Sequence, residues 1–315
     1  MTGRTPAPSL AGLHGADQRR PLYSRLPVLY FLAPAWVKLA ARSAFAARQG
    51  RIDALVQRYL GVLEGAPAGD GSPVPVVLTH DVDTAEGLAT LPRLLAVEEA
   101  LGLSSLVFLV THRYPWDRAA LARLAGRGHA FGVHDTMHDN RLAYLPPARV
   151  EARIRHAQEA LGPLDSGAFR APAFLRSASL YEGIAARVRV DFSTNDSALV
   201  WPHPGDGLGS PFPVRYRRVT VVPTTLPRDG ELLALGLDRE ATLDLCQRKA
   251  TQLAHVGAPV VVLTHPDPTF TDTAKRLETY GELLRWLRAS PRFAIPRPAD
   301  ALADLQRRAT AELSA

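Results

Sequence analysis

Cysteine is almost absent from this chain of 315 residues, in which Cys246 is the single example. One cysteine excludes a disulfide within the chain and is typical of a reducing compartment. Long hydrophobic runs are also absent. The most apolar stretch, residues 26–36, is interrupted by proline and is shorter than the roughly 20 residues that a transmembrane helix needs. We therefore predict a cytoplasmic protein.

Clustered positive charge and glycine-rich phosphate loops are missing too. The net charge of +6 is carried almost wholly by arginines, and these are scattered rather than interleaved with aromatic residues. This pattern predicts no nucleic-acid partner. No Gly-rich dinucleotide loop follows the first predicted strand, and no internal repeat is evident. A nucleotide-binding open sheet is therefore disfavoured.

From residue 74 onward, short apolar runs alternate with stretches of helical periodicity. Strand–helix alternation with short connections predicts a parallel sheet. About seven such units in one domain favour a (β/α)-barrel, so the predicted fold class is α/β. The predicted strands are 74–79, 105–110, 129–133, 168–170, 188–193, 219–223 and 260–264. The predicted helices lie near 86–101, 117–126, 147–161, 178–187 and 238–256.

This alternation defines one catalytic domain, residues 74–300, with extensions at both ends. Residues 1–20 are rich in glycine, proline and small residues and are predicted to be disordered. Residues 21–73 are predicted to be a helical extension and linker, and residues 301–315 a C-terminal helix or tail. Within the extension, residues 26–51 leave three alternatives open: a helix packed on the domain, peripheral membrane contact, or an export signal.

Two short segments carry most of the chemistry. Residues 79–83 (Thr-His-Asp-Val-Asp) end the first predicted strand, and residues 134–138 (His-Asp-Thr-Met-His) follow the third. His134 and His138 are four residues apart, so on one helical turn both rings can reach one ion. Two histidines and one carboxylate form a common hydrolytic metal set that leaves a position open for water. The sequence therefore predicts a metal-dependent hydrolase.

Further polar residues follow the ends of the predicted strands. In parallel barrels the catalytic groups gather where strands end and loops begin. Side chains from widely separated segments are therefore expected to converge on one rim. These residues are Asp81, Asp83, His134, His138, Arg170, Asp191 and His265.

On these residues the chain resembles the polysaccharide deacetylases of the NodB-homology type, carbohydrate esterase family 4. The resemblance covers roughly residues 74–266 and consists of five motifs in order. They are Asp81-Val82-Asp83, His134 to His138, Arg170-Ala171-Pro172, the segment around Asp191-Phe192-Ser193, and Leu263-Thr264-His265-Pro266. The resemblance implies a NodB-like fold, a distorted (β/α)-barrel of about seven strands, in agreement with the alternation described above.

The resemblance also implies a role for each matching residue. Asp81 would be the general base, His265 the general acid and Arg170 the partner that holds Asp81. The backbone amide of Ala173 would be an oxyanion donor. The implied metal ligands are Asp83, His134 and His138. Zinc is the ion that this ligand set favours, and cobalt, nickel or iron(II) also fit.

The chain departs from the family's pattern in three places. His80 stands where the family often has an aromatic residue, and its role is left open. Ala173 replaces a frequent aromatic residue, and the fourth motif lacks the usual tryptophan. The departures at Ala173 and in the fourth motif lie near the substrate, so they leave the substrate class open. Which carboxylate orients His265 is open as well: Asp191 is preferred, and Asp196 is the rival.

Together, the residues and the resemblance predict a hydrolase of C–N amide bonds that deacetylates an N-acetylated sugar or glycan precursor. A lipid-linked or nucleotide-linked substrate is expected inside the cell. Two alternatives stay open: deformylation of a lipid-linked formamido sugar or cleavage of a small non-sugar amide, and a catalytically silent carbohydrate-binding protein. The presence of Asp81, Arg170 and His265 argues against the silent protein. The sequence does not specify an oligomeric state.

Overall fold

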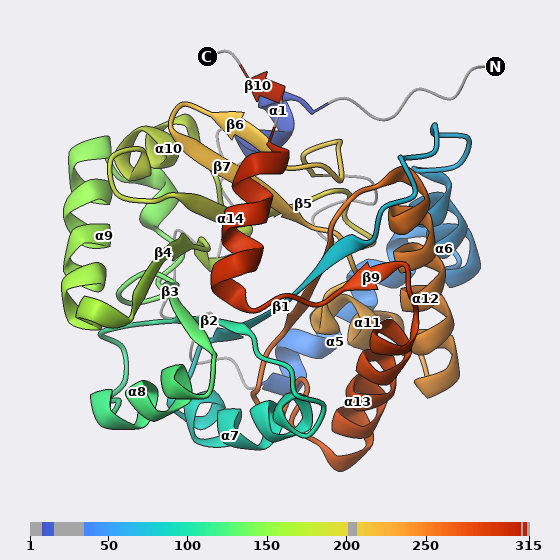
Figure 1. The fold of residues 1–315 in the computed structure, drawn as a ribbon, viewed down its shortest axis with the longest axis horizontal. Helices are drawn as coiled ribbons and strands as arrows, with labels where there is room; N and C mark the ends of the chain where they lie inside the picture. The colour runs from blue at the N-terminus through green and yellow to red at the C-terminus, as the bar shows by residue number, and fades with distance from the viewer. Residues whose placement is uncertain (1–7, 16–34, 201–206, 310, 314–315) are drawn as a thin grey trace.

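Seven parallel strands form the centre of the molecule (Figure 1). The computed structural model describes residues 8–15, 35–200, 207–309 and 311–313. The parallel strands run in the order β7-β5-β4-β3-β2-β1-β8. Their bounds are β1 (Val74–Val82), β2 (Leu106–Leu109), β3 (Ala130–Val133), β4 (Asp165–Phe169), β5 (Val190–Asn195), β7 (Val219–Thr224) and β8 (Val260–Thr264). The predicted α/β class and strand number are confirmed.

The two ends of the parallel run approach each other at β7 and β8. Directly after β7, the backbone N–H groups of Thr225 and Leu226 donate to the Val261 carbonyl of β8, at 3.3 and 3.2 Å. These two bonds take the place of a full ladder, so the barrel is distorted. Three short strands extend the sheet: β6 (Val214–Tyr216), β9 (Phe293–Ala294) and β10 (Ala311–Leu313). Of these, β6 lies in the connection between β5 and β7.

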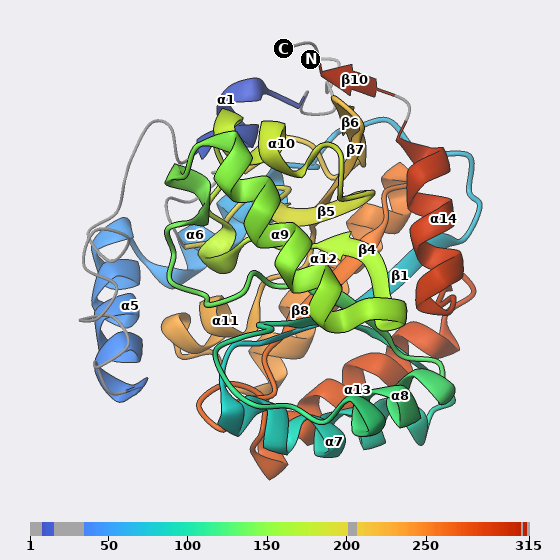
Figure 2. The same ribbon diagram turned by 90° about the vertical axis from the view of Figure 1, so that its left-hand side faces the viewer.

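Helices cover the outer face of the barrel, and several begin at a capping side chain. Thr84 accepts from the Gly87 amide at 2.9 Å, and Ser177 from the Leu180 amide at 3.0 Å, which satisfies amides left free in a first helical turn. Figure 2 shows two of the helices, α9 and α10, packed side by side. The helices are α7 (Ala85–Glu99), α8 (Arg118–Gly126), α9 (Pro147–Leu161), α10 (Ala178–Ile184), α11 (Asp229–Leu235), α12 (Arg239–Val256) and α13 (Ala274–Ala289). The sequence prediction omitted α11 and α13.

The amino-terminal end of the barrel is filled by the last helix, α14 (Pro298–Arg308), which crosses the strands in Figure 1. Its Ala301, Leu302 and Leu305 pack with inward-facing residues of the strands, among them Val77. The predicted domain boundary at residue 300 thus falls inside a helix that belongs to the barrel core. Because this end is closed, the polar site must lie at the opposite end.

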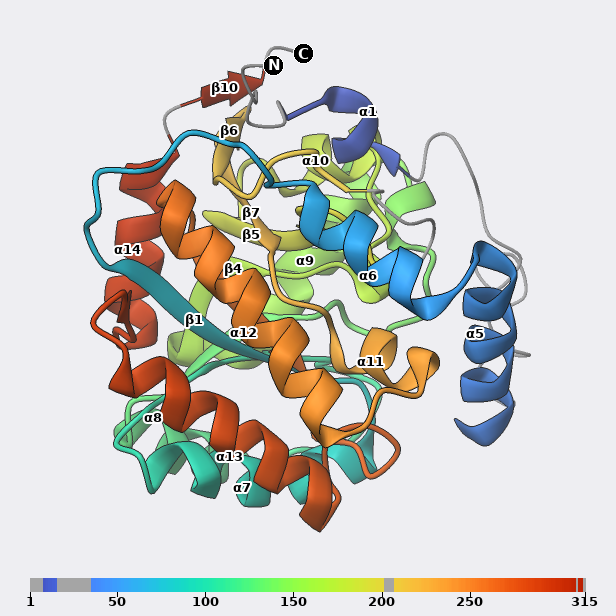
Figure 3. The same cartoon turned by 90° about the vertical axis from the view of Figure 1, so that its right-hand side faces the viewer.

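The N-terminal extension packs on one side of the barrel. Helix α6 (Ile52–Gly61) buries Leu55, Tyr59 and Leu60 in a cluster that includes Leu245 of α12, and α5 (Ala35–Gln49) lies beside α11 (Figure 3). Membrane contact through 26–51 stays a prediction, and residues 26–34 lie outside the described part of the chain. Among the described residues, no helix is long and apolar enough to cross a membrane.

The structure also describes residues 8–15 of the segment predicted to be disordered. There the chain forms a short helix, α1 (Leu10–Leu13), and Leu13 is buried. The side chain of Ser9 caps this helix by accepting from the Gly12 amide at 3.1 Å. The Ser9 amide in turn donates to the Leu208 carbonyl at 3.1 Å, so α1 is attached to the barrel. The remainder of 1–20 lies outside the described residues.

Side chains of β1 alternate between two environments. Val77 belongs to the cluster inside the barrel, whereas Val76, Leu78 and Val82 belong to the cluster between the barrel and its helices. Successive side chains of a strand point to opposite faces. Odd-numbered positions therefore point into the barrel and even-numbered positions point outward.

Gly132 of β3 is expected to be intolerant of a side chain. A Cβ there would lie 2.8 Å from the Phe108 ring and 2.9 Å from the Ala168 carbonyl oxygen. We expect Gly132→Ala to lower the free energy of unfolding by about 1–3 kcal/mol, because overpacking displaces neighbours. Urea unfolding measures this change. Gly126→Ala is the control, since nothing lies within 4 Å of its Cβ. Equal stability of the two variants would contradict the expectation.

Candidate active site

The Asp81 carboxylate is held by a buried guanidinium. Arg170 follows β4 directly and is fully buried. Its Nη1 donates to Asp81 Oδ1 at 2.7 Å, its Nη2 to Thr79 Oγ1 at 2.9 Å, and its Nε to the Phe192 carbonyl at 3.1 Å. The Phe108 ring lies against the guanidinium, 4.4 Å from Cζ to the ring centroid. Asp81 is thereby fixed with Oδ2 directed away from Arg170 and toward the histidines.

The three predicted metal ligands come together. Asp83, His134 and His138 each place one ligand atom within 4.8 Å of the others. Asp83 Oδ1 lies 3.2 Å from His134 Nε2 and 3.4 Å from His138 Nε2. The ring of His134 is oriented by its Nδ1–H, which donates to the Arg170 carbonyl at 2.7 Å. Such second-layer hydrogen bonds fix the tautomer of a ligating histidine and direct Nε2 toward the ion.

The donor set fits a divalent cation. Asp83 Oδ1 is buried and accepts no hydrogen bond from any described residue. Burial lowers the pKa of His138 to about 4, so its imidazole is neutral and able to ligate. Burial also acts against a charge on His134, but the carboxylates of Asp81 and Asp83 outweigh it and raise the pKa of His134. The same negative potential attracts a metal ion.

The loop that carries the two histidines differs from the expected helical turn. Residues 134–138 are not helical, and Asp135 and His138 have positive φ values of 69° and 51°. The prediction of a shared helical face was therefore wrong, although the two rings do converge, with centroids 5.0 Å apart. Left-handed backbone at residues other than glycine is costly and persists where the surroundings impose it.

Arg153 of α9 imposes this conformation. Its guanidinium donates to both carboxylate oxygens of Asp135, at 2.6 and 2.7 Å, and to both of Asp139, at 2.9 and 3.1 Å. Asp135 is fully buried. A planar guanidinium that binds two carboxylates in this way fixes their relative geometry. The sequence reading did not identify Arg153, because its partners became evident only from the packing of α9 on the loop.

His265, which follows β8, faces Asp81 and is held from behind by Asp229. Its Nε2 lies 4.0 Å from Asp81 Oδ2, while Nδ1–H donates to Asp229 Oδ1 at 2.8 Å. The Phe270 ring lies against the imidazole, with centroids 4.8 Å apart and the ring planes tilted by 32°. Burial disfavours the imidazolium, but the carboxylates of Asp229, Asp83 and Asp81 together outweigh burial and raise the pKa of His265 to about 10. His265 is therefore a protonated acid at neutral pH.

Neither carboxylate proposed from the sequence orients His265. Asp191 lies on the outer face of β5, since Val190 and Phe192 face the barrel interior. It accepts from Tyr181 Oη at 2.8 Å and from the Ser193 amide at 3.1 Å. Asp196 pairs with Lys249 at 2.8 Å. The missed residue, Asp229, lies shortly after β7, and the rule that polar groups follow strand ends could have found it.

Asp191 instead supports the backbone that leads to Ala173. Its Oδ1 accepts from the Ser193 hydroxyl, and the Ser193 Oγ accepts from the Ala171 amide at 2.7 Å. Two residues further on, Ala173 and Phe174 have positive φ values of 51° and 56°. Consecutive left-handed residues that are not glycine mark a constrained turn, a feature that clusters at functional sites.

The His80 side chain points out of the barrel and connects β1 to its neighbours. Its Nε2–H donates to Glu98 Oε1 of α7 at 2.8 Å, and its Nδ1 lies 2.7 Å from Thr264 Oγ1 at the end of β8. Tyr280 of α13 also donates to Glu98 Oε1, at 2.6 Å. His80 thus ties the site-bearing ends of β1 and β8 to each other and to α7.

Similar folds occur among solved structures. A Mycobacterium smegmatis protein assigned as a polysaccharide deacetylase has a TM-score of 0.60 at 16% identity, covering 79% of this chain and 97% of that one. An allantoinase has a TM-score of 0.56 at 11% identity, covering 74% and 90%. A Pseudomonas aeruginosa protein assigned as a polysaccharide deacetylase has a TM-score of 0.56 at 12% identity, covering 75% and 92%. No family model and no curated protein matches.

These likenesses show the class of structure, an α/β barrel. The polar site described above lies at the carboxyl ends of its strands. More narrowly, the chain has the NodB-like fold of the polysaccharide deacetylases of carbohydrate esterase family 4. The resemblance inferred from the five sequence motifs is confirmed at the level of the fold.

Arg153→Met tests whether the guanidinium pre-forms the metal loop. We expect the affinity for Zn²⁺ to fall roughly 10-fold or more, because residues that support metal ligands contribute on this scale. Titration calorimetry on the chelator-treated protein measures the affinity, and a melting curve verifies folding. Arg155→Met is the matched control on the same helix, since Arg155 is exposed and pairs only loosely with Glu159, at 3.8 Å. Equal Zn²⁺ affinity in the two variants would disprove the role of Arg153.

Proposed function

We propose that this protein is a metal-dependent hydrolase of C–N amide bonds that removes the acetyl group from an N-acetylated sugar or glycan precursor. The observation that carries the proposal is the arrangement around Asp81 Oδ2. This oxygen lies 3.7 Å from Nε2 of His134, a metal-ligand candidate, and 4.0 Å from Nε2 of His265. A base, an acid and a metal-binding triad therefore adjoin one another.

Asp83, His134 and His138 would hold the ion, and zinc is the ion we propose, with Co²⁺, Ni²⁺ and Fe²⁺ as alternatives. When bound, a divalent ion supplies Lewis-acid polarisation of the acyl oxygen and lowers the pKa of water. In the proposed reaction, proton transfer and additional stabilisation of the acyl oxygen are carried out by side chains and backbone groups of the protein.

In the proposed reaction Asp81 takes a proton from the attacking water at Oδ2. Arg170 holds this carboxylate in its orientation through its bond to Oδ1. The negative charge that develops on the acyl oxygen is stabilised by the backbone amide of Ala173, which the strained turn positions. His265, protonated at neutral pH, donates the proton on Nε2 to the departing nitrogen.

The substrate class rests on the fold. Two of the structures with similar folds are assigned as polysaccharide deacetylases, which supports an N-acyl sugar. Another is named an allantoinase, and allantoin is a small non-sugar amide. That neighbour favours the second candidate function, cleavage of a small amide by the same residues. A formyl group on a lipid-linked sugar would require the same chemistry.

Acetate release from nucleotide-linked, lipid-linked and oligomeric N-acetyl sugars tests the reaction, with formylated sugars and small amides in parallel. We expect activity to need a divalent ion. Asp81→Asn and His265→Ala should each lose about 100-fold or more, as expected when a positioned acid or base is removed. His255→Ala is the control, because His255 is exposed at the end of α12. Full activity in both Asp81→Asn and His265→Ala would refute the assignment.

The pH profile tests the Asp229–His265 pair. The Asp229 carboxylate raises the pKa of His265, so the acid stays protonated up to alkaline pH. Asp229→Asn removes this charge and lowers the pKa of His265. The falling alkaline limb of kcat/KM is therefore expected to move to lower pH. The exposed Asp244→Asn is the control. If the alkaline limb of Asp229→Asn stays at the pH of the unchanged protein, the limb reports the titration of a group other than His265.

A further inference from the structure

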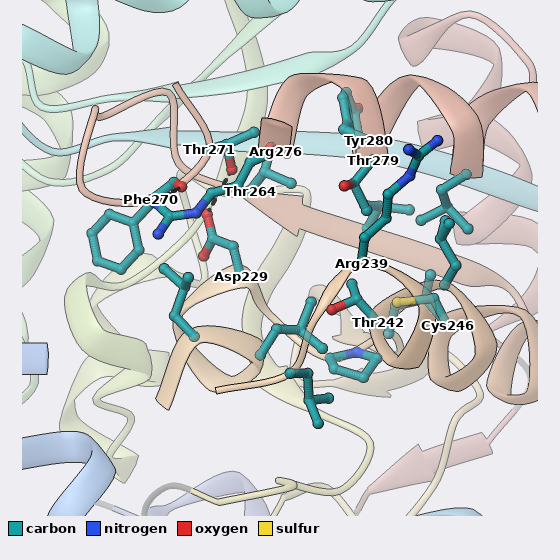
Figure 4. Close-up of a pocket in the computed structure, with 18 of the residues that line it drawn as sticks. Asp229, Arg239, Thr242, Cys246, Thr264, Phe270, Thr271, Arg276, Thr279 and Tyr280 are labelled. Carbon is teal, nitrogen blue, oxygen red and sulfur yellow. Dashed lines mark hydrogen bonds between the residues drawn. The ribbon is translucent and has the colours of Figure 1, made fainter. Parts of the chain in front are cut away.

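A cavity of about 290 Å³ lies outside β8, between α11, α12 and α13 (Figure 4). Seven of its 21 lining residues are leucines, which makes leucine the commonest residue there, and the buried thiol of Cys246 is part of the lining. Figure 4 shows Asp229, Thr271 and Phe270 at one end and Arg239, Thr242 and Cys246 at the other. The leucines in the lining include Leu232, Leu233, Leu237, Leu243 and Leu283. None of these leucines takes part in the proposed reaction.

The size and lining of this space suit a small ligand. Protein interiors are close-packed, and few voids exceed a water molecule. A space of this volume falls near the lower limit for small-molecule pockets, which are predominantly apolar with a few placed polar groups. The leucines among the lining residues favour a flexible aliphatic chain, because apolar surface removed from water is stabilising.

The charges around the opening determine the polar end of the ligand. Lys275 is exposed and has no carboxylate within 4.0 Å among the described residues. Arg276 donates to the carbonyls of Thr269 and Phe270, so its charge is not neutralised by an acid. Arg239 reaches from α12 to Glu278 and Glu282 of α13.

Both carboxylates that line the cavity accept hydrogen bonds from other groups of the protein. Asp229 accepts from His265 and Thr271, and Asp238 accepts from the Ala241 amide at the start of α12. These bonds leave the carboxylates charged, but three cationic side chains (Arg239, Lys275 and Arg276) line the cavity against the two carboxylates. The lining therefore has a net charge of +1, which complements an anionic head group.

We propose that this cavity binds a single aliphatic chain that carries one anionic group, with the chain among the leucines and the head group at Lys275. The ligand class is a fatty-acid carboxylate or the corresponding alkyl phosphate, which share this chemistry. An occupant contacts Asp229 and Phe270, and the same two residues hold His265 from the other side. The site is separate from the metal triad, so its test does not depend on the proposed reaction.

The single cysteine provides a direct readout in the full chain. Decanoate and decyl phosphate are titrated by calorimetry, with decanol as the uncharged probe. In parallel, modification of Cys246 by methyl methanethiosulfonate is followed by mass spectrometry. Burial raises the pKa of Cys246 to about 12, so the reaction is slow and easily timed. We expect saturating decanoate to slow it at least 10-fold and decanol to bind about fivefold more weakly.

Variants of the lining residues separate the contribution of the ligand's aliphatic chain to binding from that of its anionic head group. Leu243→Trp fills the cavity and should abolish binding. Lys275→Glu should weaken decanoate binding about fivefold while leaving decanol binding unchanged. Arg285→Glu, a charge reversal on the exposed face of the same helix, should have no effect. Lys275 is exposed, so its variant is informative even if Leu243→Trp unfolds. Failure of decanoate to protect Cys246, or equal binding of decanoate and decanol, overturns the proposal.

Discussion

A cation without access to water determines how the rest of the site is built. Arg170 is fully buried, and the cost of removing a guanidinium from water is several kcal/mol unless partners compensate. Its side chain is compensated by Asp81, Thr79 and the Phe192 carbonyl. Its own carbonyl accepts from His134. The proposed base and one proposed metal ligand are thus oriented by a single residue, because neither Arg170 nor Asp81 can be buried alone.

Much of this arrangement follows from local rules that a sequence carries. Apolar runs alternate with helical periodicity, and the seven parallel strands follow from that alternation. Polar residues at the carboxyl ends of strands converge at one end of a barrel, as Asp81, His134, Arg170 and His265 do. The roles of these residues in catalysis remain predictions, whereas their convergence is observed.

Other parts depend on packing that the sequence does not display. Asp229 contacts His265 only because α11 folds back against the end of β8. The loop from His134 to His138 needs Arg153 from another helix, so residue spacing alone suggested the wrong conformation. The direction of the Asp191 side chain, in contrast, could have been predicted from the alternation of apolar residues along β5. Val190 and Phe192 are apolar and face inward, which places Asp191 outward, away from His265.

The alternation along β1 also limits how this protein can change in length. Asp81 and Asp83 point into the barrel, and His80, which directly precedes Asp81, points to α7. One residue inserted or deleted after Val77 would reverse these faces and would bury His80 in the site. Insertions and deletions are therefore compatible with the exposed segment that precedes β1 and incompatible with the strand itself. Homologues of any sequence that keep this chemistry should retain the spacing from Val77 to Asp83 even where all other lengths vary.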